Sequence, residues 1–225
     1  MGHGAHDEAL GDAVARVASE LRAGIAEVWT HVHARLPLIG IFFVRTAGMV
    51  AAIAAIIVIK DQFPDAGDRF GRLSSSALAL GSAGVGAFVG ALTAPWFGRR
   101  FSESQLMLLG FAVSGVGIIA LGGINSIVAI LGLTFIGGLG GFIAKVAVDA
   151  LLQRALPDDY RGRGFAIYDI VYNMATVLAA ALVIGGEATQ LRSFLIAVGA
   201  LTILLAAALG SAMTRAGMLN EASVG

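Results

Sequence analysis

The chain has 225 residues, of which 57% are hydrophobic and 13% are charged, and its formal net charge is zero. Soluble domains carry about a quarter charged residues, so this composition, with a mean hydropathy of +0.85, indicates a membrane protein. The balanced charge predicts no nucleic-acid partner, and the absence of cysteine excludes disulfides, thiol catalysis and cysteine-ligated metals.

Residues 1–36 form a polar segment that is predicted to be helical from about residue 7 and to lie outside the membrane. Apolar residues recur in it at spacings of three and four, which places them along one helix face. They are Leu10, Val14, Val17, Leu21, Ile25, Val28 and Val32. Two interpretations are open: an amphipathic helix on the membrane surface or against a partner, or a cytoplasmic linker, which we favour.

All four histidines, His3, His6, His31 and His33, lie in this polar segment. His31 and His33 cannot share a helix face, and neither cysteine nor a dense group of carboxylates accompanies them. We therefore expect no metal site. A serine–histidine hydrolytic site within the membrane is not expected either, because no histidine follows position 33.

Six apolar segments follow, each within the range of about 17–25 residues that is typical of membrane-spanning helices. The first five cover about residues 38–59, 76–97, 106–122, 127–150 and 164–185, and the sixth ends near residue 214. Residues 37–215 are therefore predicted to form an all-α domain of six transmembrane helices, with a cytoplasmic tail over 216–225. In the second span, Gly86 and Gly90 have the spacing that lets helices approach closely.

The distribution of basic residues predicts that both termini are cytoplasmic. On the side of the termini lie nine: Arg16, Arg22, Arg35, Arg99, Arg100, Arg154, Arg161, Arg163 and Arg215. On the opposite side lie four: Lys60, Arg69, Arg72 and Arg192. An excess of Lys and Arg marks the cytoplasmic face of a membrane protein. We expect a multi-pass protein of the cell membrane (the plasma or inner membrane).

The longest polar interruption between apolar segments that themselves carry charges covers residues 149–173. It is predicted to be a loop with a basic triplet, Arg161, Gly162 and Arg163, before the fifth span. One predicted stripe of the fourth span consists of Thr134, Gly138, Gly141, Lys145 and Asp149. One stripe of the fifth span consists of Asp169, Tyr172, Asn173 and Thr176. Polar stripes are costly in lipid and should face protein or water.

Arg45, Lys145 and Asp169 are predicted to lie at similar depths, about 7–12 Å from the cytoplasmic ends of their spans. Opposite charges inside a membrane usually pair, so we expect an ion pair between Lys145 and Asp169. Two interpretations are open: a water-filled substrate pathway with an ionisable coupling group, or a structural charge lock joined by Arg161 or Arg163.

The segment LPDDYRGRGFAIYD, residues 156–169, resembles the loop between the fourth and fifth helices of a six-helix half in the major facilitator superfamily, especially in drug-efflux-like permeases. The resemblance covers this segment closely and the rest of the chain by its pattern of spans. It implies the C-terminal half of a twelve-helix transporter, built from two inverted three-helix repeats around a midplane site.

The turn before the third span also resembles a motif of this family, Gly-x-x-x-Asp-Arg-x-Gly-Arg-Arg. The chain keeps its last three residues as Gly98, Arg99 and Arg100. It has Pro95 and Trp96 in place of the acidic residue and the first arginine, and Ala91 in place of the first glycine. The resemblance implies a gating role for this turn; the alternative is a pair of arginines that anchors a helix end at lipid phosphates.

The resemblance implies a secondary transporter, an efflux-type permease or antiporter, that moves a small solute by alternating access. A chain of six spans supplies half of such a unit, so we expect a second six-helix half or a homodimer as its partner within the bilayer. No phosphate-binding loop or other enzyme motif is present, and we expect neither an enzyme nor a cofactor. The alternatives are a non-transporting remnant that pairs with or regulates other membrane proteins and, last, a six-helix channel.

Overall fold

The computed structural model describes residues 19, 22–65, 73–123, 126–184 and 191–219, and this part of the chain is helical without strands. A short helix over residues 22–30 precedes six long ones. These are α2 (Val32–Gln62), α4 (Ser75–Gly98), α5 (Glu103–Gly123), α6 (Ile127–Ala155), α7 (Asp158–Ile184) and α8 (Leu191–Arg215). All six are long and apolar enough to cross a membrane. The predicted all-α fold with six spanning helices is confirmed.

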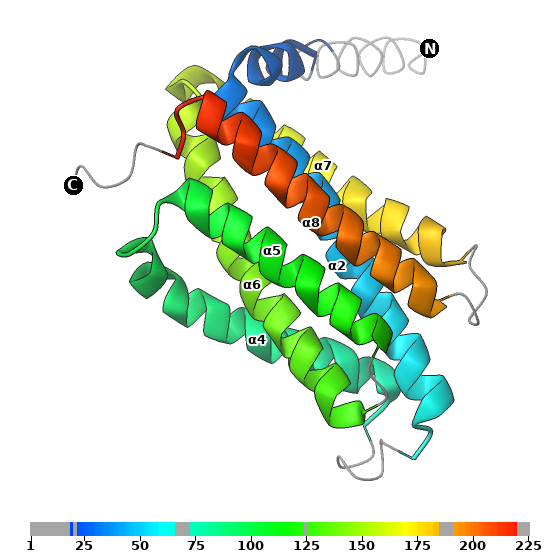
Figure 1. The fold of residues 1–225 in the computed structure, drawn as a ribbon. Helices are drawn as coiled ribbons and strands as arrows, with labels where there is room; N and C mark the ends of the chain where they lie inside the picture. The colour runs from blue at the N-terminus through cyan, green and yellow to red at the C-terminus, as the bar shows by residue number, and fades with distance from the viewer. Residues whose placement is uncertain (1–18, 20–21, 66–72, 124–125, 185–190, 220–225) are drawn as a thin grey trace, which may run out of the picture.

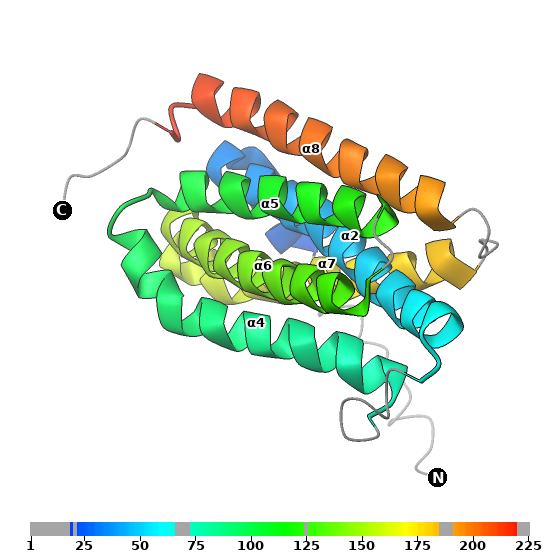
Figure 2. The same cartoon turned by 60° about the horizontal axis from the view of Figure 1, so that its bottom comes forward.

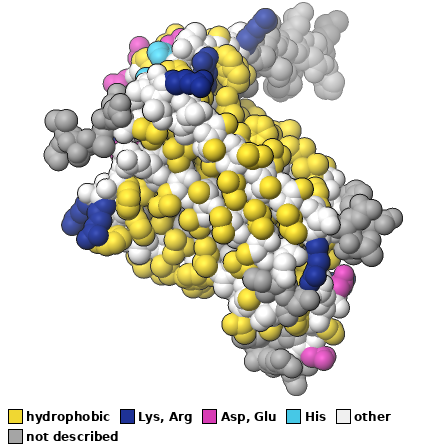
Figure 3. Space-filling model, viewed as in Figure 1, with side chains coloured by type: hydrophobic (Ala, Val, Ile, Leu, Met, Phe, Trp, Pro, Cys, Tyr) yellow, Lys and Arg dark blue, Asp and Glu magenta, His cyan; other side chains and the backbone are white. Residues whose placement is uncertain are grey.

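One face of the molecule has the distribution of side chains that a bilayer requires. Apolar side chains cover the middle of the face shown in Figure 3, whereas Lys, Arg, Asp and Glu gather toward two ends of the bundle. The first residue of α2 and the last residue of α8 lie at the same end (Figure 1). An even number of spans therefore returns the chain to the side on which it entered.

The beginning of α7 differs from the prediction. Arg161, Gly162 and Arg163 were expected in a loop, but α7 begins at Asp158 and includes all three. Acidic residues in the first turn favour a helix because they oppose its positive N-terminal dipole, and Asp158 also binds Arg161 at 2.7 Å. Only residues 156 and 157 separate α6 from α7. Hydropathy does not predict this first turn of α7, because the residues that stabilise it are charged.

Helix α2 occupies the centre of the bundle and contacts each of the other five long helices. Figures 1 and 2 show it running between the pair α5 and α6 on one side and α7 and α8 on the other. By contrast, α6 and α7 share few contacts although a two-residue link joins them. Short connections therefore do not make these two helices neighbours along their length.

The six long helices divide into two groups of three, α2–α4–α5 and α6–α7–α8. We call their contact pattern an exchange, because each helix packs mainly on helices of the other group. The second helix of each group packs on the first helix of the other, in the pairs α4–α6 and α7–α2. The third helix of each group also packs on the first helix of the other, and the two third helices, α5 and α8, pack together. This is the pattern of contacts that two related three-helix repeats would be expected to give.

Glycines form the closest helix crossings. A Cβ at Gly86 of α4 would meet the carbonyl oxygen of Phe135, and one at Gly138 of α6 would meet that of Ala83. In the pair α5–α8, a Cβ at Gly199 would lie 2.7 Å from the carbonyl oxygen of Gly115. Only a residue without a side chain permits such approaches. The close packing predicted for Gly86 is confirmed.

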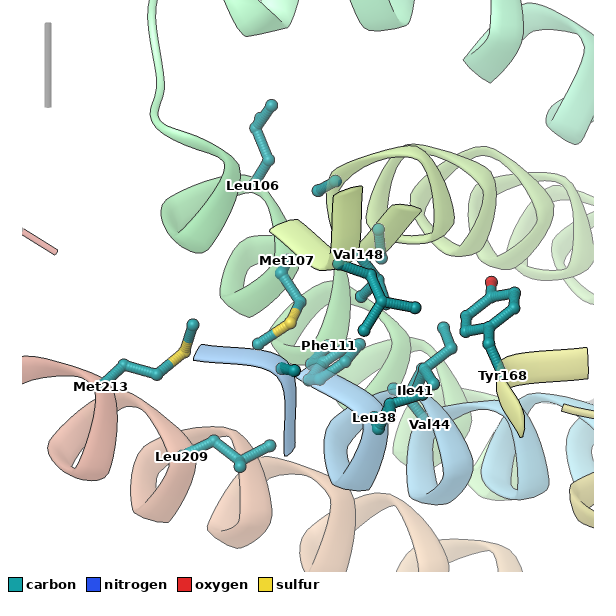
Figure 4. Packing of buried hydrophobic residues seen from close by; sticks show 14 of the residues in the cluster. Leu38, Ile41, Val44, Leu106, Met107, Phe111, Val148, Tyr168, Leu209 and Met213 are labelled. Carbon is teal, nitrogen blue, oxygen red and sulfur yellow. The ribbon is translucent and has the colours of Figure 1, made fainter. Parts of the chain in front are cut away.

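Two groups of buried side chains form the core, one near each end of the bundle. The group nearer the termini includes Ile41, Phe111 and Tyr168, which Figure 4 shows packed together with methionines of α5 and α8. The other group is almost wholly aliphatic and includes Val50 and Leu195. Aromatic side chains are therefore concentrated in the end of the core nearer the termini.

The predicted N-terminal helix is described from residue 22. Its Val28 is buried in the core, and a Cβ at Gly24 would lie 3.2 Å from Cβ of Arg163, so this helix packs on the beginning of α7. Ile25 and Trp29 are exposed. Several predicted residues lie outside the described residues: His3, His6, Leu10, Val14, Arg16, Val17, Leu21, Arg69 and Arg72.

Candidate functional site

Four side chains from three helices form a cluster of cations and aromatic rings. The guanidinium of Arg45 in α2 lies 4.3 Å from the ring centroid of Tyr172 in α7. The ammonium of Lys145 in α6 lies 5.3 Å from the ring of Tyr168 and 5.9 Å from that of Tyr172. The two tyrosine rings stack, with centroids 5.8 Å apart. These cation–π contacts connect α2 and α6 to α7.

The ion pair predicted between Lys145 and Asp169 does not form. Lys145 instead binds Asp149 of its own helix, with 2.8 Å between Nζ and Oδ2, and Asp169 is exposed. The prediction relied on equal depth and a short loop. Because α6 and α7 share few contacts, a carboxylate one helical turn away lies closer than one on the neighbouring helix in sequence.

Three buried polar atoms in this region have no hydrogen-bond partner in the described part of the chain: Nε of Arg45, Oδ1 of Asp149 and the hydroxyl of Tyr168. Figure 4 shows the Tyr168 ring beside Ile41, with its hydroxyl directed away from α2. Buried polar groups in folded proteins usually have partners, and a group without one is explained by strain, by a bound water or ion, or by a functional role. The opposite end of the core has no such atom among the described residues.

A partly open cleft of about 430 Å³ lies beside this cluster and is lined by residues of α2, α4, α5, α6 and α7. Arg45, Lys145 and Tyr172 line it, and so do Thr134, Gly138 and Gly141 of the predicted α6 stripe. Asp149, the last member of that stripe, is not among the lining residues. Four of the five residues of the predicted stripe therefore line the cleft.

Small residues keep the cleft open. A Cβ built at Gly48, Gly84, Gly117, Gly137 or Gly141 would meet no atom within 4 Å, and all five glycines line the cleft. Of these five, only Gly141 belongs to a stripe predicted from the sequence; Gly48, Gly84, Gly117 and Gly137 do not. Their helical spacing does not distinguish them from glycines that form helix contacts, such as Gly86.

The polar stripe predicted on α7 divides into two parts. Tyr172 reaches the cleft, whereas Asp169 and Asn173 are exposed. Asn173 donates a hydrogen bond to the Asp169 carbonyl at 2.8 Å, and Thr176 donates one to the Tyr172 carbonyl at 3.5 Å. The stripe thus leaves two polar side chains on the surface near the middle of a 27-residue spanning helix.

The other predicted motif residues lie at the end of the bundle that holds the termini. Gly98 ends α4, Arg99 follows it, and Arg100 lies 4.6 Å from the Trp96 ring centroid. Arg154 bridges α6 to α5 through Glu103 at 2.7 Å. In the described residues no group of three or more His, Cys, Asp or Glu could hold a metal ion. His31 contacts Glu27 at 3.0 Å.

The fold and the cleft define a polytopic membrane protein with six spanning helices and an internal site that contains two cations. Comparison with protein-family models, with curated protein sequences and with solved structures gave no match. The relationship to a family therefore stays a prediction from residues 156–169, and the function is argued from the geometry of the cleft.

Proposed function

We propose that this chain transports a small solute across the cell membrane, as one six-helix half of a twelve-helix secondary transporter of the major facilitator type. The observation that carries the proposal is the cleft among α2, α4, α5, α6 and α7, with Arg45 and Lys145 in its wall. Ionisable residues within membrane spans face protein interiors or water-filled cavities, and they commonly mark substrate or ion pathways.

The exchange of helix contacts between α2–α4–α5 and α6–α7–α8 supports this class of transporter. In transporters built from inverted repeats, the substrate site lies where the repeats meet. The cleft has this position, because α2 and α6, the first helices of the two groups, both line it and contact each other. Alternating access then consists of rocking of one six-helix half against another.

Exposed polar residues support a partner half. Asp169 and Asn173 lie on the surface near the middle of α7, where a single copy in lipid would leave a carboxylate against hydrocarbon. A second six-helix half or a second copy of this chain would cover them and close the open side of the cleft. The isolated monomer should therefore transport nothing.

Cysteine accessibility tests the pathway directly, because the chain has no cysteine. Gly141→Cys places a thiol in the cleft, and Gly132→Cys places one on the exposed surface of the same helix. In proteoliposomes, a charged, membrane-impermeant thiosulfonate reagent should modify the first variant and leave the second unmodified. Equal protection of both would contradict an aqueous pathway and favour the non-transporting interaction protein.

The orientation proposed here is with both termini in the cytoplasm. Ser102→Cys, in the turn between α4 and α5, should be protected from the impermeant reagent added outside intact cells. Ser76→Cys, in the first turn of α4, should react. The reverse labelling pattern would reverse the topology.

Reconstituted flux tests transport. A covalently tethered tandem dimer should move solute in liposomes, whereas monomer fixed at one copy per vesicle should not. If the natural partner is a separate six-helix chain, co-purification with that chain should restore flux. Flux through a demonstrated monomer, or simultaneous access from both sides with ion conductance, would contradict the half-transporter proposal.

A further inference from the structure

We infer that the cleft selects an organic anion, a carboxylate on an apolar body, and that Arg45 binds the carboxylate. This inference rests on the proposed transport function, because it assigns a substrate class to the same cleft. Three features of the cleft support an anion: its net charge, the geometry of Arg45 and the apolar wall.

The net charge of the cleft is positive. Its wall contains Arg45 and Lys145 but no Asp or Glu. The ammonium of Lys145 is compensated by Asp149 at 2.8 Å. Arg45 takes part in no ion pair with any carboxylate in the described parts of the chain. One uncompensated cation therefore remains near the middle of the 31-residue α2, where a charge without a partner is costly.

The geometry of Arg45 suits a planar anion. Its guanidinium lies over the Tyr172 ring at 4.3 Å, which occupies a face of the group. The N–H donors of a guanidinium lie in its plane and remain available at its edges. Nε of Arg45 is buried, so a ligand in the cleft would meet the edge formed by the two Nη atoms. A carboxylate accepts two parallel hydrogen bonds from such an edge, a geometry that a lysine cannot reproduce.

The remainder of the wall suits an apolar body. Leu80, Leu133 and Phe142 line the cleft together with the glycines that leave it open. Pockets that bind drug-sized ligands have volumes of about 300–1,000 Å³ and a few polar groups in an apolar lining, and the volume of about 430 Å³ lies in this range. A two-ring aromatic acid would place its rings among these residues and its carboxylate at Arg45.

A binding experiment with a charge series tests the inference without requiring flux. Radiolabelled 2-naphthoate is bound to the purified full chain in phosphatidylcholine nanodiscs, and protein-free nanodiscs give the background from partitioning. Unlabelled 2-naphthoate should displace the label, whereas 2-naphthylmethylammonium should not. Equal displacement by the ammonium compound, or no binding above background, would overturn the inference.

Two sets of variants, each with its own control, locate the site. Arg45→Gln should weaken 2-naphthoate binding about tenfold or more, Arg45→Lys should weaken it less, and Arg215→Gln, at the end of α8, should leave it unchanged. Gly141→Leu should fill the cleft and abolish binding, whereas Gly132→Leu on the exposed surface of α6 should not. Size-exclusion profiles identify misfolded variants. Unchanged binding in folded Arg45→Gln would contradict the assignment of Arg45.

Two further experiments complete the test. One distinguishes a soluble acid from a lipid headgroup as the bound anion, and the other distinguishes failure of the inference from failure of the proposed transport function. If phosphatidylglycerol in the nanodiscs displaces 2-naphthoate, Arg45 binds a lipid headgroup and the inference of a soluble acid is wrong. Anion-selective binding with no flux in the tandem dimer would support the inference while contradicting transport. Flux with charge-indifferent binding would support transport while overturning the inference.

Discussion

Two helix pairs occupy equivalent places in the exchange of the three-helix groups, yet they are built differently. Between α4 and α6, backbones meet at Gly86 and Gly138, and Ser82 donates a hydrogen bond to the Leu131 carbonyl at 2.6 Å. Between α2 and α7, large side chains meet instead, with Arg45 on Tyr172 at 4.3 Å. At the α4–α6 crossing the hydroxyls of Ser82 and Thr134 are hydrogen-bonded, whereas Arg45 and Tyr168 in the other region each bury a polar atom without a partner among the described residues.

This difference indicates a division of roles within the bundle. A crossing at which backbones touch cannot change its distance or rotation without opening voids, so α4 and α6 should move together. A crossing filled by a cation and aromatic rings can be rearranged by side-chain rotation, and it adjoins the cleft. We therefore expect substitutions at α4–α6 to affect stability and those at α2–α7 to affect binding.

The largest effect is expected at the α4–α6 crossing. Gly86→Ala adds a methyl group against the Phe135 carbonyl and should lower the free energy of unfolding by about 1–3 kcal/mol. Gly81→Ala, on the exposed surface of the same helix, should be neutral or raise it by up to about 1 kcal/mol, because alanine favours helix more than glycine does. Thermal unfolding in detergent measures both. Equal effects would mean that the crossing is not close.

The next effect is expected for the Lys145–Asp149 pair. Lys145→Met and Asp149→Asn each strand a partly buried charge and should each cost about 1–2 kcal/mol of stability, less than a fully lipid-exposed charge. The double variant should lose less than the sum, because no uncompensated charge remains.

A second double-mutant cycle, with Asp169→Asn and Lys145→Met, serves as the control for the Lys145–Asp149 cycle. Asp169 is exposed and takes part in no ion pair among the described residues. Those two changes should therefore be additive in thermal unfolding of the monomer. Coupling between Lys145 and Asp169 would restore the interhelical pair predicted from their depths.

The sequence predicted the number and nature of the spans because hydropathy over some 20 residues is a property of the chain itself. It also placed Thr134, Gly138, Gly141 and Lys145 on one face of α6, because helical spacing fixes which side chains share a face. The structure adds that this face lines the cleft.

Two features could not be predicted from the sequence. Neither depth nor loop length fixes the rotation of a helix about its axis or its neighbours, so the partner of Lys145 was assigned to the wrong helix. Glycines are also ambiguous: Gly84 faces open space in the cleft, while Gly86, two residues along the chain, contacts the backbone of α6. Only the position at which α6 packs against α4 distinguishes Gly84 from Gly86.

The smallest effects on the free energy of unfolding are expected for two hydroxyl deletions, one at the α4–α6 crossing and one in α7, and they should differ in sign. Ser82→Ala removes a hydroxyl that lies 2.6 Å from both the Leu131 carbonyl and the Thr134 hydroxyl, and should cost about 0.6 kcal/mol, a typical value within membranes. The loss stays small because Thr134 keeps its own bond to Leu131 at 2.9 Å. Tyr168→Phe removes a buried hydroxyl with no partner in the described chain, and should be neutral or slightly stabilising. Thermal unfolding compares them; a loss in Tyr168→Phe as large as that in Ser82→Ala would mean that the Tyr168 hydroxyl is hydrogen-bonded, with Asp149 as the acceptor to test.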